Sequence, residues 1–342
     1  MREILRMQQR LVPDLIDVLR RRHMILRHLA LLGTAGRRTL AHSLAIGERV
    51  LRAETDFLRE QGLVRIDARG MEVSEAGREL LREMEPMIGS LFGLSEMEDE
   101  LRRRFSLKAV TVVPGDSDLS PAAKKDLGRA GAAALIRFVS PQSDIVAVTG
   151  GSTMAEVAGW LNPAVPFRGV CFVPARGGLG ESVELQANTI ASTMAKNTGA
   201  TYRLLHVPDH LGEEAYQSLM QEPNIREVVA EVRRARIVIH GIGDAVRMAR
   251  RRNMDEAAIA ALVSDGALAE AFGYYFNRDG QVVHKMPTLG LRLEDIQQTE
   301  TVIAVAGGAS KGRAIAAVLR FGHEDVLVTD EAAARVILDE LA

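Results

Sequence analysis

The feature that most constrains the fold is a series of seven short apolar runs, rich in Val and Ile, in the second part of the chain. These runs cover residues 107–115, 144–151, 169–175, 201–208, 235–243, 301–308 and 324–330. Helical patterns, such as residues 121–139, separate them. Continuous apolar strands that alternate with helices indicate a mostly parallel sheet with helices on both faces. We therefore expect a large α/β domain over residues 107–342.

Several of the expected strands end in polar loops that contain glycine, namely TGGST, PARGG, HGIGD and AGGASKG. Ligands of such sheets bind beyond the carboxyl ends of the strands. In TGGST, Gly150 and Gly151 allow close approach of the backbone, and the start of a helix favours an anion. Arg176 and Lys311 add cations to two other loops. The loops together predict a site for a phosphorylated small molecule, although some of these glycines can serve only tight turns.

The first eighty residues have a different pattern, in which apolar residues recur at helical spacing. Helices are expected at 15–32, 37–46 and 47–61, followed by two short strands around a polar tip at residues 67–70. This order is typical of a winged helix-turn-helix, whose third helix enters the major groove of DNA. We therefore expect a DNA-binding domain over residues 1–80.

Arginine is concentrated in this N-terminal part. Residues 20–70 contain eleven arginines and five acids, a net charge of +6, whereas the whole chain carries −2. We expect Thr39 to cap the second helix, and Val50, Leu51 and Phe57 to pack inward from the third. The candidate DNA contacts are Arg37, Arg38, Thr39, Glu48, Arg49 and Arg52. Arginine can bind guanine through two hydrogen bonds, and the remaining arginines are expected to contact phosphates. A solvated helical face and a protein-binding winged helix are the alternatives.

A helical connector is expected between these two parts, over residues 81–106. Its helical pattern extends over residues 75–105, with an interruption near Pro86 and Gly89. Apolar residues at helical spacing could pair two chains or pack on the body of the same chain; they are Leu80, Leu81, Met84, Met87, Ile88 and Leu91. Because one winged helix offers a small contact area for DNA, we expect a homo-oligomer, either a dimer or a tetramer.

Composition and missing motifs exclude other classes of protein. Cys171 is the only cysteine, so the chain forms no internal disulfide. No His/Cys cluster has the spacing of a metal site, and no dinucleotide or Walker pattern is present. No apolar run is long enough to cross a membrane, and the N-terminus lacks the apolar core of a signal peptide. We expect a cytoplasmic protein without a metal or a cofactor.

The order of these motifs, with DGALAEAFG added, resembles the SorC-type sugar-responsive bacterial repressors over nearly the whole chain. It is most similar to the repressors of glycolytic genes in that family, whose effector is fructose-1,6-bisphosphate. The resemblance implies that the α/β domain has the fold of ribose-5-phosphate isomerase and glucosamine-6-phosphate deaminase. It also implies a repressor whose partners are double-stranded operator DNA and a phosphorylated sugar.

The resemblance further implies a set of effector-binding residues. Gly151, Ser152 and Thr153 would hold one phosphate, with Lys311 nearby. The second phosphate would be held by Arg176, Gln186 and Thr189. Glu270 would accept hydrogen bonds from sugar hydroxyls, and Arg251 is a further candidate phosphate contact. Ser152 stands where a threonine is expected, but either hydroxyl can donate a hydrogen bond.

The main alternative is an enzyme, a phosphosugar isomerase or deaminase. Such chemistry needs a carboxylate base and a second acid group at the sugar carbons. Asp244, Asp265 and Glu270 are carboxylates in suitable loops, so residue types alone do not exclude it. A winged helix, however, is of use to a sensor that acts on DNA and of no use to a metabolic isomerase. We therefore predict a regulator without catalytic residues.

Overall fold

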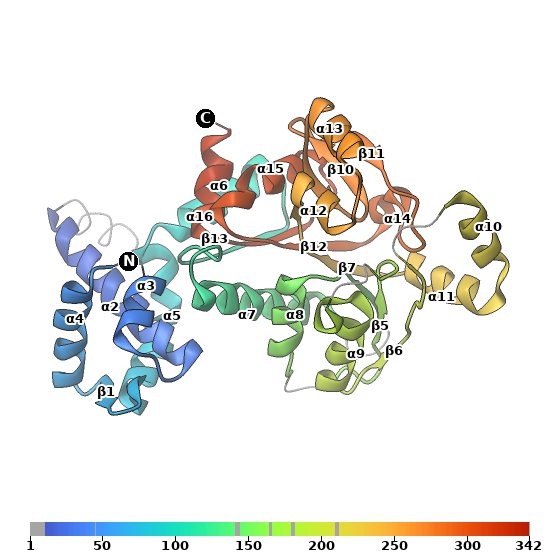
Figure 1. Ribbon diagram of the computed structural model, residues 1–342. Helices are drawn as coiled ribbons and strands as arrows, with labels where there is room; N and C mark the ends of the chain where they lie inside the picture. The colour runs from blue at the N-terminus through green and yellow to red at the C-terminus, as the bar shows by residue number, and fades with distance from the viewer. Residues whose placement is uncertain are drawn as a thin grey trace.

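The computed structural model describes residues 11–44, 46–140, 144–163, 166–178, 182–208 and 212–341. Figure 1 shows a small N-terminal body, in blue, beside a larger α/β body. The long central helix α7 (Pro121–Phe138) runs from the boundary between the two bodies along the large sheet.

The N-terminal body has the helix and hairpin order that the sequence predicts. Its elements are α2 (Pro13–Leu32), α3 (Arg37–Ser43), α4 (Glu48–Glu60), β1 (Val64–Asp67) and β2 (Gly70–Val73). The two strands are antiparallel, and Ala35 forms a bridge to Met71 of β2. Ile25, Leu40 and Leu58 belong to a core that joins the three helices to the hairpin. This body is therefore a winged helix with its own apolar core.

Two details of these helices differ from the expectations. Gly36, not Thr39, precedes the first residue of α3, and no side chain caps that helix. The inward face of α4 is formed by Leu51, Glu54, Thr55 and Leu58, whose spacing matches one helical stripe. Val50 and Phe57 are 41% and 36% exposed, so the expectation that they pack inward is wrong.

The connector consists of α5 (Glu75–Leu91) and α6 (Leu94–Arg104). The expected interruption near Pro86 and Gly89 is wrong, because α5 continues through both positions. The break lies at Gly93, whose φ of +73° is the left-handed conformation that glycine adopts readily. Ile88 and Leu91 are buried in the core of the α/β body. These connector residues therefore pack on the same chain, which was one of the two alternatives.

The large body is built on a parallel sheet of seven strands in the order β3-β13-β12-β7-β4-β5-β6. Every neighbouring pair is parallel, as the apolar runs predict. The strands are β3 (Ala109–Val113), β4 (Ile145–Val148), β5 (Cys171–Pro174), β6 (Thr201–Tyr202), β7 (Ile237–His240), β12 (Thr301–Val305) and β13 (Val326–Asp330). Strand order reverses between β4 and β7, where open α/β sheets form their ligand crevice.

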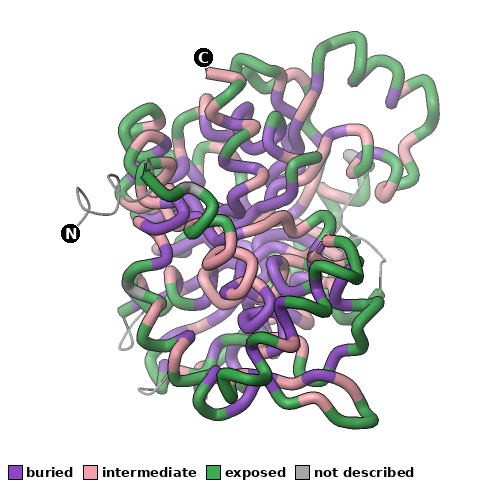
Figure 2. The backbone as a smooth tube through the Cα atoms, turned by 90° about the vertical axis from the view of Figure 1, so that its left-hand side faces the viewer, coloured by how far each residue is buried: buried purple, intermediate pink, exposed green. Residues whose placement is uncertain are grey.

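Helices cover both faces of this sheet (Figure 1). One face packs on α7, α8 (Ser152–Trp160) and α9 (Ala187–Thr198). The other packs on α11 (Pro223–Arg233), α15 (Gly312–Phe321) and α16 (Glu331–Asp339). Figure 2 shows the buried backbone running through the middle of the molecule, with exposed segments around it.

A second sheet, which the sequence did not predict, lies near the carboxyl ends of the large one. It is antiparallel, in the order β11-β10-β9-β8, with the strands β8 (Gly243–Asp244), β9 (Ala267–Ala271), β10 (Tyr274–Asn277) and β11 (Val282–Lys285). The helices α12 (Ala245–Arg251) and α13 (Glu256–Ser264) accompany it. The remaining elements are α10 (Glu213–Gln221), α14 (Leu293–Gln298) and the short 3-10 helices Val183–Leu185 and Ala309–Lys311.

Candidate functional site

A cavity of about 480 Å³ lies at the carboxyl ends of β4 and β7, where strand order reverses. The amide of Gly241 after β7 donates to the hydroxyl of Thr149 after β4, at 3.2 Å, and so connects the two loops. Eight of the nine predicted effector residues line this cavity; they are Gly151, Ser152, Thr153, Arg176, Gln186, Arg251, Glu270 and Lys311. Thr189 is the exception: it lies in the first turn of α9 and is not among the lining residues.

One wall of the cavity is the N-terminus of α8. Gly151 has a φ of +111°, and a Cβ on Gly150 would lie 2.7 Å from the carbonyl oxygen of Leu185, so both positions need glycine. The first amides of a helix have no partner within it, and here they belong to Ser152 and Thr153. These amides and the adjoining hydroxyls are donors suited to an anion.

Lys311 reaches the same cavity from the loop before α15. Its ammonium forms no hydrogen bond or ion pair with the part of the chain that the structure describes. Burial lowers the pKa of Lys311, and the nearby Asp118 and Asp330 oppose this shift. The amides of Gly308 and Ser310 already bind the carboxylates of Asp330 and Asp118, at 2.7 and 2.8 Å. The loop therefore offers its lysine to a ligand, whereas these two amides are occupied.

The opposite wall contains a buried charge cluster. Glu270 on β9 accepts hydrogen bonds at one oxygen, Oε1, from Arg176 at 3.0 Å, Arg252 at 2.8 Å and the amide of Gly273 at 2.7 Å. Burial alone would raise the pKa of Glu270, but Arg252, Arg176 and the Gly273 amide outweigh burial and lower it. Glu270 is thus an anion that fixes two guanidinium groups at the cavity. Its predicted contact with sugar hydroxyls stays a prediction.

The cavity also has charged lining residues outside the predicted effector set; they are Lys124, Arg247, Arg252, Asp118 and Asp244. Arg247 and Arg251 are one helical turn apart on α12, which begins after Asp244 because that side chain accepts from the Arg247 amide at 2.9 Å. In all, six cationic side chains and three carboxylates line the cavity; they are Lys124, Arg176, Arg247, Arg251, Arg252 and Lys311, with Asp118, Asp244 and Glu270. The arginine run at 247–252 was a usable signal, but only the position of the helix start shows which members face inward.

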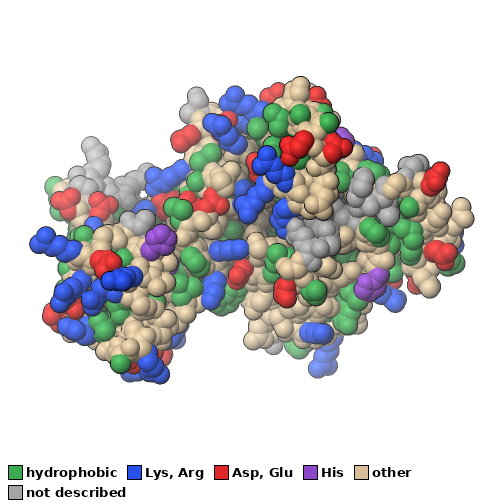
Figure 3. Space-filling view, in the orientation of Figure 1, with side chains coloured by type: hydrophobic (Ala, Val, Ile, Leu, Met, Phe, Trp, Pro, Cys, Tyr) green, Lys and Arg blue, Asp and Glu red, His purple; other side chains and the backbone are tan. Residues whose placement is uncertain are grey.

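The predicted DNA contacts lie on α3 and α4 of the winged helix. Arg37, Arg38, Thr39, Glu48, Arg49 and Arg52 are all exposed, at the beginning of α3 and along α4. The ion pairs of this face are loose: Arg38 lies 3.8 Å from Glu48, and Arg52 lies 3.9 Å from Asp56. Figure 3 shows Lys and Arg side chains gathered on this body and a second group beneath α12 and α13. Such an exposed cationic face suits contact with nucleic acid.

Four arginines of the N-terminal block, which were expected to contact DNA phosphates, form ion pairs within the chain. Arg21 and Arg22 bind the buried Glu54 of α4, and the guanidinium of Arg22 lies 3.6 Å from the ring centre of Phe57. Arg20 binds Glu331 at 2.7 Å, and Arg27 binds Asp126 of α7 at 2.7 Å. Carboxylates of the same chain hold these four guanidinium groups, and their expected contact with DNA phosphates stays a prediction.

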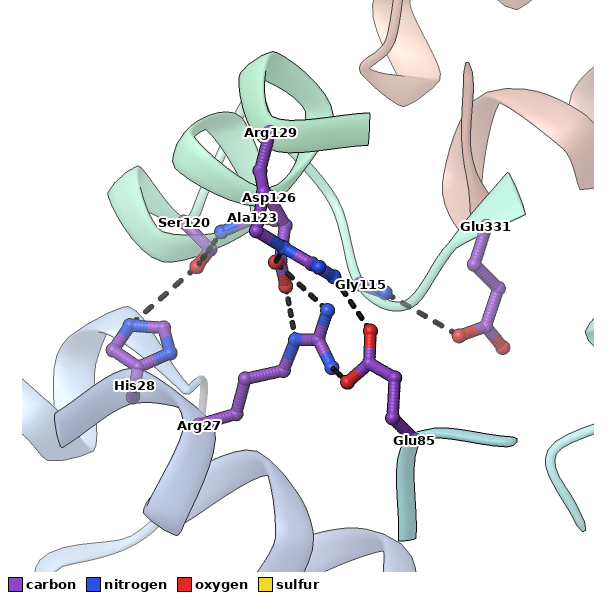
Figure 4. A network of polar contacts seen from close by, with 9 residues as sticks. All are labelled: Arg27, His28, Glu85, Gly115, Ser120, Ala123, Asp126, Arg129 and Glu331. Atoms are coloured by element: carbon purple, nitrogen blue, oxygen red, sulfur yellow. Dashed lines mark hydrogen bonds and ion pairs between the residues drawn. The ribbon is translucent and has the colours of Figure 1, made fainter. Parts of the chain in front are cut away.

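Two of these four join the bodies to each other, as Figure 4 shows for Arg27. Its guanidinium contacts Asp126 of α7 and Glu85 of α5, and Arg129 of α7 binds both acids. Asp126 is 2% exposed. The winged helix is therefore fixed to the α/β body by a network that is partly excluded from water.

Two other observations bear on function. Asp265 is exposed and does not line the cavity, so of the three carboxylates considered for isomerase chemistry only Asp244 and Glu270 reach it. Within the described ranges, no group of three His, Cys, Asp or Glu side chains is placed to hold a metal ion. None of the helices in those ranges combines the length and the apolar character that a membrane span requires.

Known proteins show similarity to the chain over its full length. A central glycolytic genes regulator of Priestia megaterium is 45% identical over 99% of both chains. The structure of a SorC family transcriptional regulator from Enterococcus faecalis matches 71% of this chain and 99% of its own, with 41% identity and a TM-score of 0.67. The full-length sorbitol operon regulator SorC of Klebsiella pneumoniae covers 89% of this chain and 94% of its own at 20% identity, with a TM-score of 0.66, and supports the fold alone.

A winged helix with an arginine face, joined to an α/β body with a cationic cavity, defines a transcription regulator with a small-molecule sensor. Residues 18–88 match the family described as "CggR N-terminal DNA binding domain", and residues 90–339 match the "Putative sugar-binding domain" family. The chain belongs to the SorC family of sugar-responsive transcriptional regulators, in the group of the central glycolytic genes regulators. The comparisons thus identify a regulator and not an isomerase or deaminase.

Proposed function

We propose that the chain represses glycolytic genes in the cytoplasm. We further propose that fructose-1,6-bisphosphate, bound in the cavity, controls the affinity of the protein for operator DNA. The similar protein of Priestia megaterium carries the name of a glycolytic regulator, which supports the choice of genes. The choice of effector comes from the resemblance to the repressors of glycolytic genes, and the six cationic side chains of the cavity support a ligand with more than one phosphate.

The observation that supports this proposal is a single cavity lined by six cationic side chains and by the N-terminus of α8. We propose that the predicted effector residues among them form two anion subsites. The first consists of the N-terminus of α8 with Ser152 and Thr153, together with Lys311. The second consists of Arg176 and Arg251 with Gln186. A sugar with a phosphate at each end would pair with both sets, whereas a monophosphate would leave one set without its anion. Charge matching therefore favours a bisphosphate.

Two other predicted residues, Glu270 and Thr189, would support the second anion subsite. Glu270 holds Arg176 and Arg252 in fixed positions and can also accept from a sugar hydroxyl. Thr189 follows Gln186 by three residues, within the first turn of α9, so it would act at the edge of the second subsite. Neither role needs a chemical step.

DNA binding completes the proposal. The face formed by α3 and α4 would contact operator DNA, with Arg49 and Arg52 directed at base edges and Arg37 and Arg38 at phosphates. We propose that residues 1–80 bind DNA, that residues 81–106 connect, and that residues 107–342 bind the sugar and assemble a dimer or tetramer. Two-fold assembly would present two winged helices to a repeated site.

Calorimetric titration tests the effector. We expect the wild-type chain to bind fructose-1,6-bisphosphate more tightly than fructose-6-phosphate. Arg251→Ala should weaken the bisphosphate by about 2–5 kcal/mol, the cost of removing one partner of a desolvated charge pair, and the monophosphate much less. Arg250→Ala is the matched control, because Arg250 is its neighbour on α12, is exposed and does not line the cavity.

Two results would contradict the proposal. Equal losses for the two sugars in Arg251→Ala would show that the second phosphate is not held there. Conversion of either sugar, followed by nuclear magnetic resonance during the titration, would restore the isomerase or deaminase alternative.

A further inference from the structure

Residues 114–120, which join β3 to α7, contact both the cavity and the winged helix. Ser117 and Asp118 line the cavity, whereas Gly115 and Ser120 face α2. Within the described chain, this short segment is therefore placed to connect the sugar site with the DNA-binding body. The contacts that residues 114–120 make with the cavity and with α2 show how one site could affect the other.

At the cavity end, the carboxylate of Asp118 lies in a setting suited to an anion. Its Oδ2 accepts from the amide of Ser310 at 2.8 Å, one residue before Lys311. A Cβ on Gly308 would lie 2.4 Å from Oδ1 of Asp118, so glycine at that position makes room for the carboxylate. A backbone amide beside a lysine is also what a sugar phosphate requires.

The same segment is tied to the loop by a second carboxylate. Oδ2 of Asp330 accepts from the amides of Ser117 and Gly308, at 2.8 and 2.7 Å. Asp116 accepts from the amide of Asp118 at 2.9 Å, which fixes the turn of the segment itself. A displacement of Asp118 would therefore act on the backbone of residues 116–118 and not on one side chain alone.

At the other end, the segment contacts α2 directly through Ser120 and indirectly through Gly115 and Glu331. The hydroxyl of Ser120 lies 3.4 Å from Nε2 of His28, and it also caps α7 by accepting from the amide of Ala123 at 3.1 Å. The amide of Gly115 donates to Glu331 at 3.4 Å, and Glu331 binds Arg20 of α2 at 2.7 Å. Figure 4 shows His28, Ser120, Gly115 and Glu331 in this arrangement.

We propose that Asp118 competes with a ligand phosphate for the Ser310 amide, beside Lys311, and that residues 114–120 transmit this exchange to α2. The identity of the ligand rests on the proposed function above. A carboxylate and a phosphate repel each other at one site, so binding of the phosphate displaces Asp118. The ligand then biases the position of the winged helix through the difference between the two arrangements.

The Arg27 network explains why such a displacement would reach the winged helix. Arg27 and Arg129 hold α2, α5 and α7 to one another through Asp126 and Glu85. Because α2 is fixed to α7, and Ser120 caps α7 while facing His28, a shift of residues 116–118 changes the contacts at the start of α7 and along α2.

Hydrogen–deuterium exchange of the full chain without added ligand tests this connection. Asp118→Ala, which removes the acceptor, should raise the exchange rate of the Ser310 amide and of amides in residues 20–31 by roughly fivefold or more. Asp244→Asn is the control, because it removes a charge from the same cavity but its residue caps α12 instead of joining residues 114–120. Unchanged exchange in residues 20–31 of Asp118→Ala, or an equal change in Asp244→Asn, would overturn the proposal.

Ligand and DNA titrations of Asp118→Asn test the competition. We expect this variant to bind fructose-1,6-bisphosphate roughly fivefold or more tightly, and the bisphosphate to change its DNA affinity by a smaller factor than in the wild type. Equal or weaker sugar binding would contradict the competition. If the wild-type chain binds no sugar phosphate, the proposed function fails, and the exchange measurement without ligand still decides whether residues 114–120 connect the cavity loop to α2.

Discussion

The outer face of the winged helix and the wall of the cavity are both rich in arginine, but the two regions hold it in different ways. On the outer face, Arg38 and Arg52 are exposed and lie 3.8 and 3.9 Å from their acidic partners. In the cavity wall, Arg176 and Arg252 are 9% and 2% exposed at their side chains, and both bind Glu270 within 3.0 Å.

This difference indicates what each region can recognise. Exposed arginines are screened by salt and mobile, and they suit a long polyanion whose contacts are individually weak. Buried arginines fixed by a carboxylate are already oriented, so they suit a small anion at one position. Removal of a charge should therefore cost more folding stability in the cavity than on the outer face.

The largest effect is expected for Glu270→Gln. This change keeps the shape of the side chain but removes the buried charge that binds both Arg176 and Arg252. We expect the free energy of unfolding to fall by about 3–5 kcal/mol. Glu48→Gln, on the exposed face, should change it by no more than about 0.5 kcal/mol. Urea denaturation of the two variants makes the comparison, and similar losses for both would contradict the contrast between the regions.

A smaller effect is expected from pH at the junction of the bodies. Burial lowers the pKa of His28 to about 4, with Asp126 opposing the shift. An unfolded histidine titrates near 6.5, so the unfolded chain takes up the proton first as the pH falls from about 6.5 to about 4. Stability is therefore fully present above about pH 6.5 and declines below it. The loss from His28 should be about 1.4 kcal/mol near pH 5.5.

Urea denaturation at neutral pH and near pH 5.5 measures this loss. His28→Gln should show a shallower decline with pH than the wild type. His42→Gln, at an exposed position of α3, should keep the wild-type decline. Parallel declines in the wild type and in His28→Gln would show that His28 does not contribute.

On the outer face, Arg52→Ala should affect DNA recognition and leave stability nearly unchanged. If Arg52 reads a base, the variant should lose about 1–3 kcal/mol of discrimination at one position of the site. Competition between the specific duplex and single-base variants of it measures this loss. Arg59→Ala, in the last turn of α4, is the control, and an equal effect of both changes would remove Arg52 from the base-reading residues.

The smallest effect is expected for Arg37→Ala. A phosphate contact carries no sequence information, so all duplexes should bind more weakly by a similar factor. The slope of log affinity against log salt should fall in magnitude by about one. A change in preference between duplexes, with an unchanged slope, would assign Arg37 to base recognition instead.

The sequence predicted the parts of the fold that depend on local periodicity. Helices α2, α3 and α4 and six strands of the parallel sheet follow from apolar spacing, because burial imposes that spacing directly. The seventh, β6, lies within the predicted run 201–208 but has only two residues, both exposed. The antiparallel sheet escaped prediction, since β8 has two residues and β9 is mostly small apolar residues around Glu270. Two residues have no pattern that distinguishes them from a loop, and the alanines and glutamate of β9 have a low preference for strands.

The sequence also could not predict which charged side chains form ion pairs between the winged helix and the α/β body. Arg27 and Asp126 are 99 residues apart, and Arg20 and Glu331 are 311 apart. In the sequence, these four charged residues look like ordinary exposed side chains. They meet only because α2 packs on the α/β body. The cavity loops with Gly151, Arg176 and Lys311 were easier to predict, because loops at the carboxyl ends of parallel strands meet at one edge whatever their separation in the chain. Gln186, Arg251 and Glu270 were predicted from the family resemblance alone.

The central claim is that a sugar bisphosphate in the cavity changes operator binding by the winged helix. The most direct measurement is fluorescence anisotropy of a labelled duplex from the region upstream of the chain's own gene, titrated with wild-type protein with and without fructose-1,6-bisphosphate. We expect specific binding that the bisphosphate weakens and that fructose-6-phosphate weakens much less. Identical titration curves with and without the bisphosphate, or the same affinity for a random duplex at physiological salt, would contradict the claim.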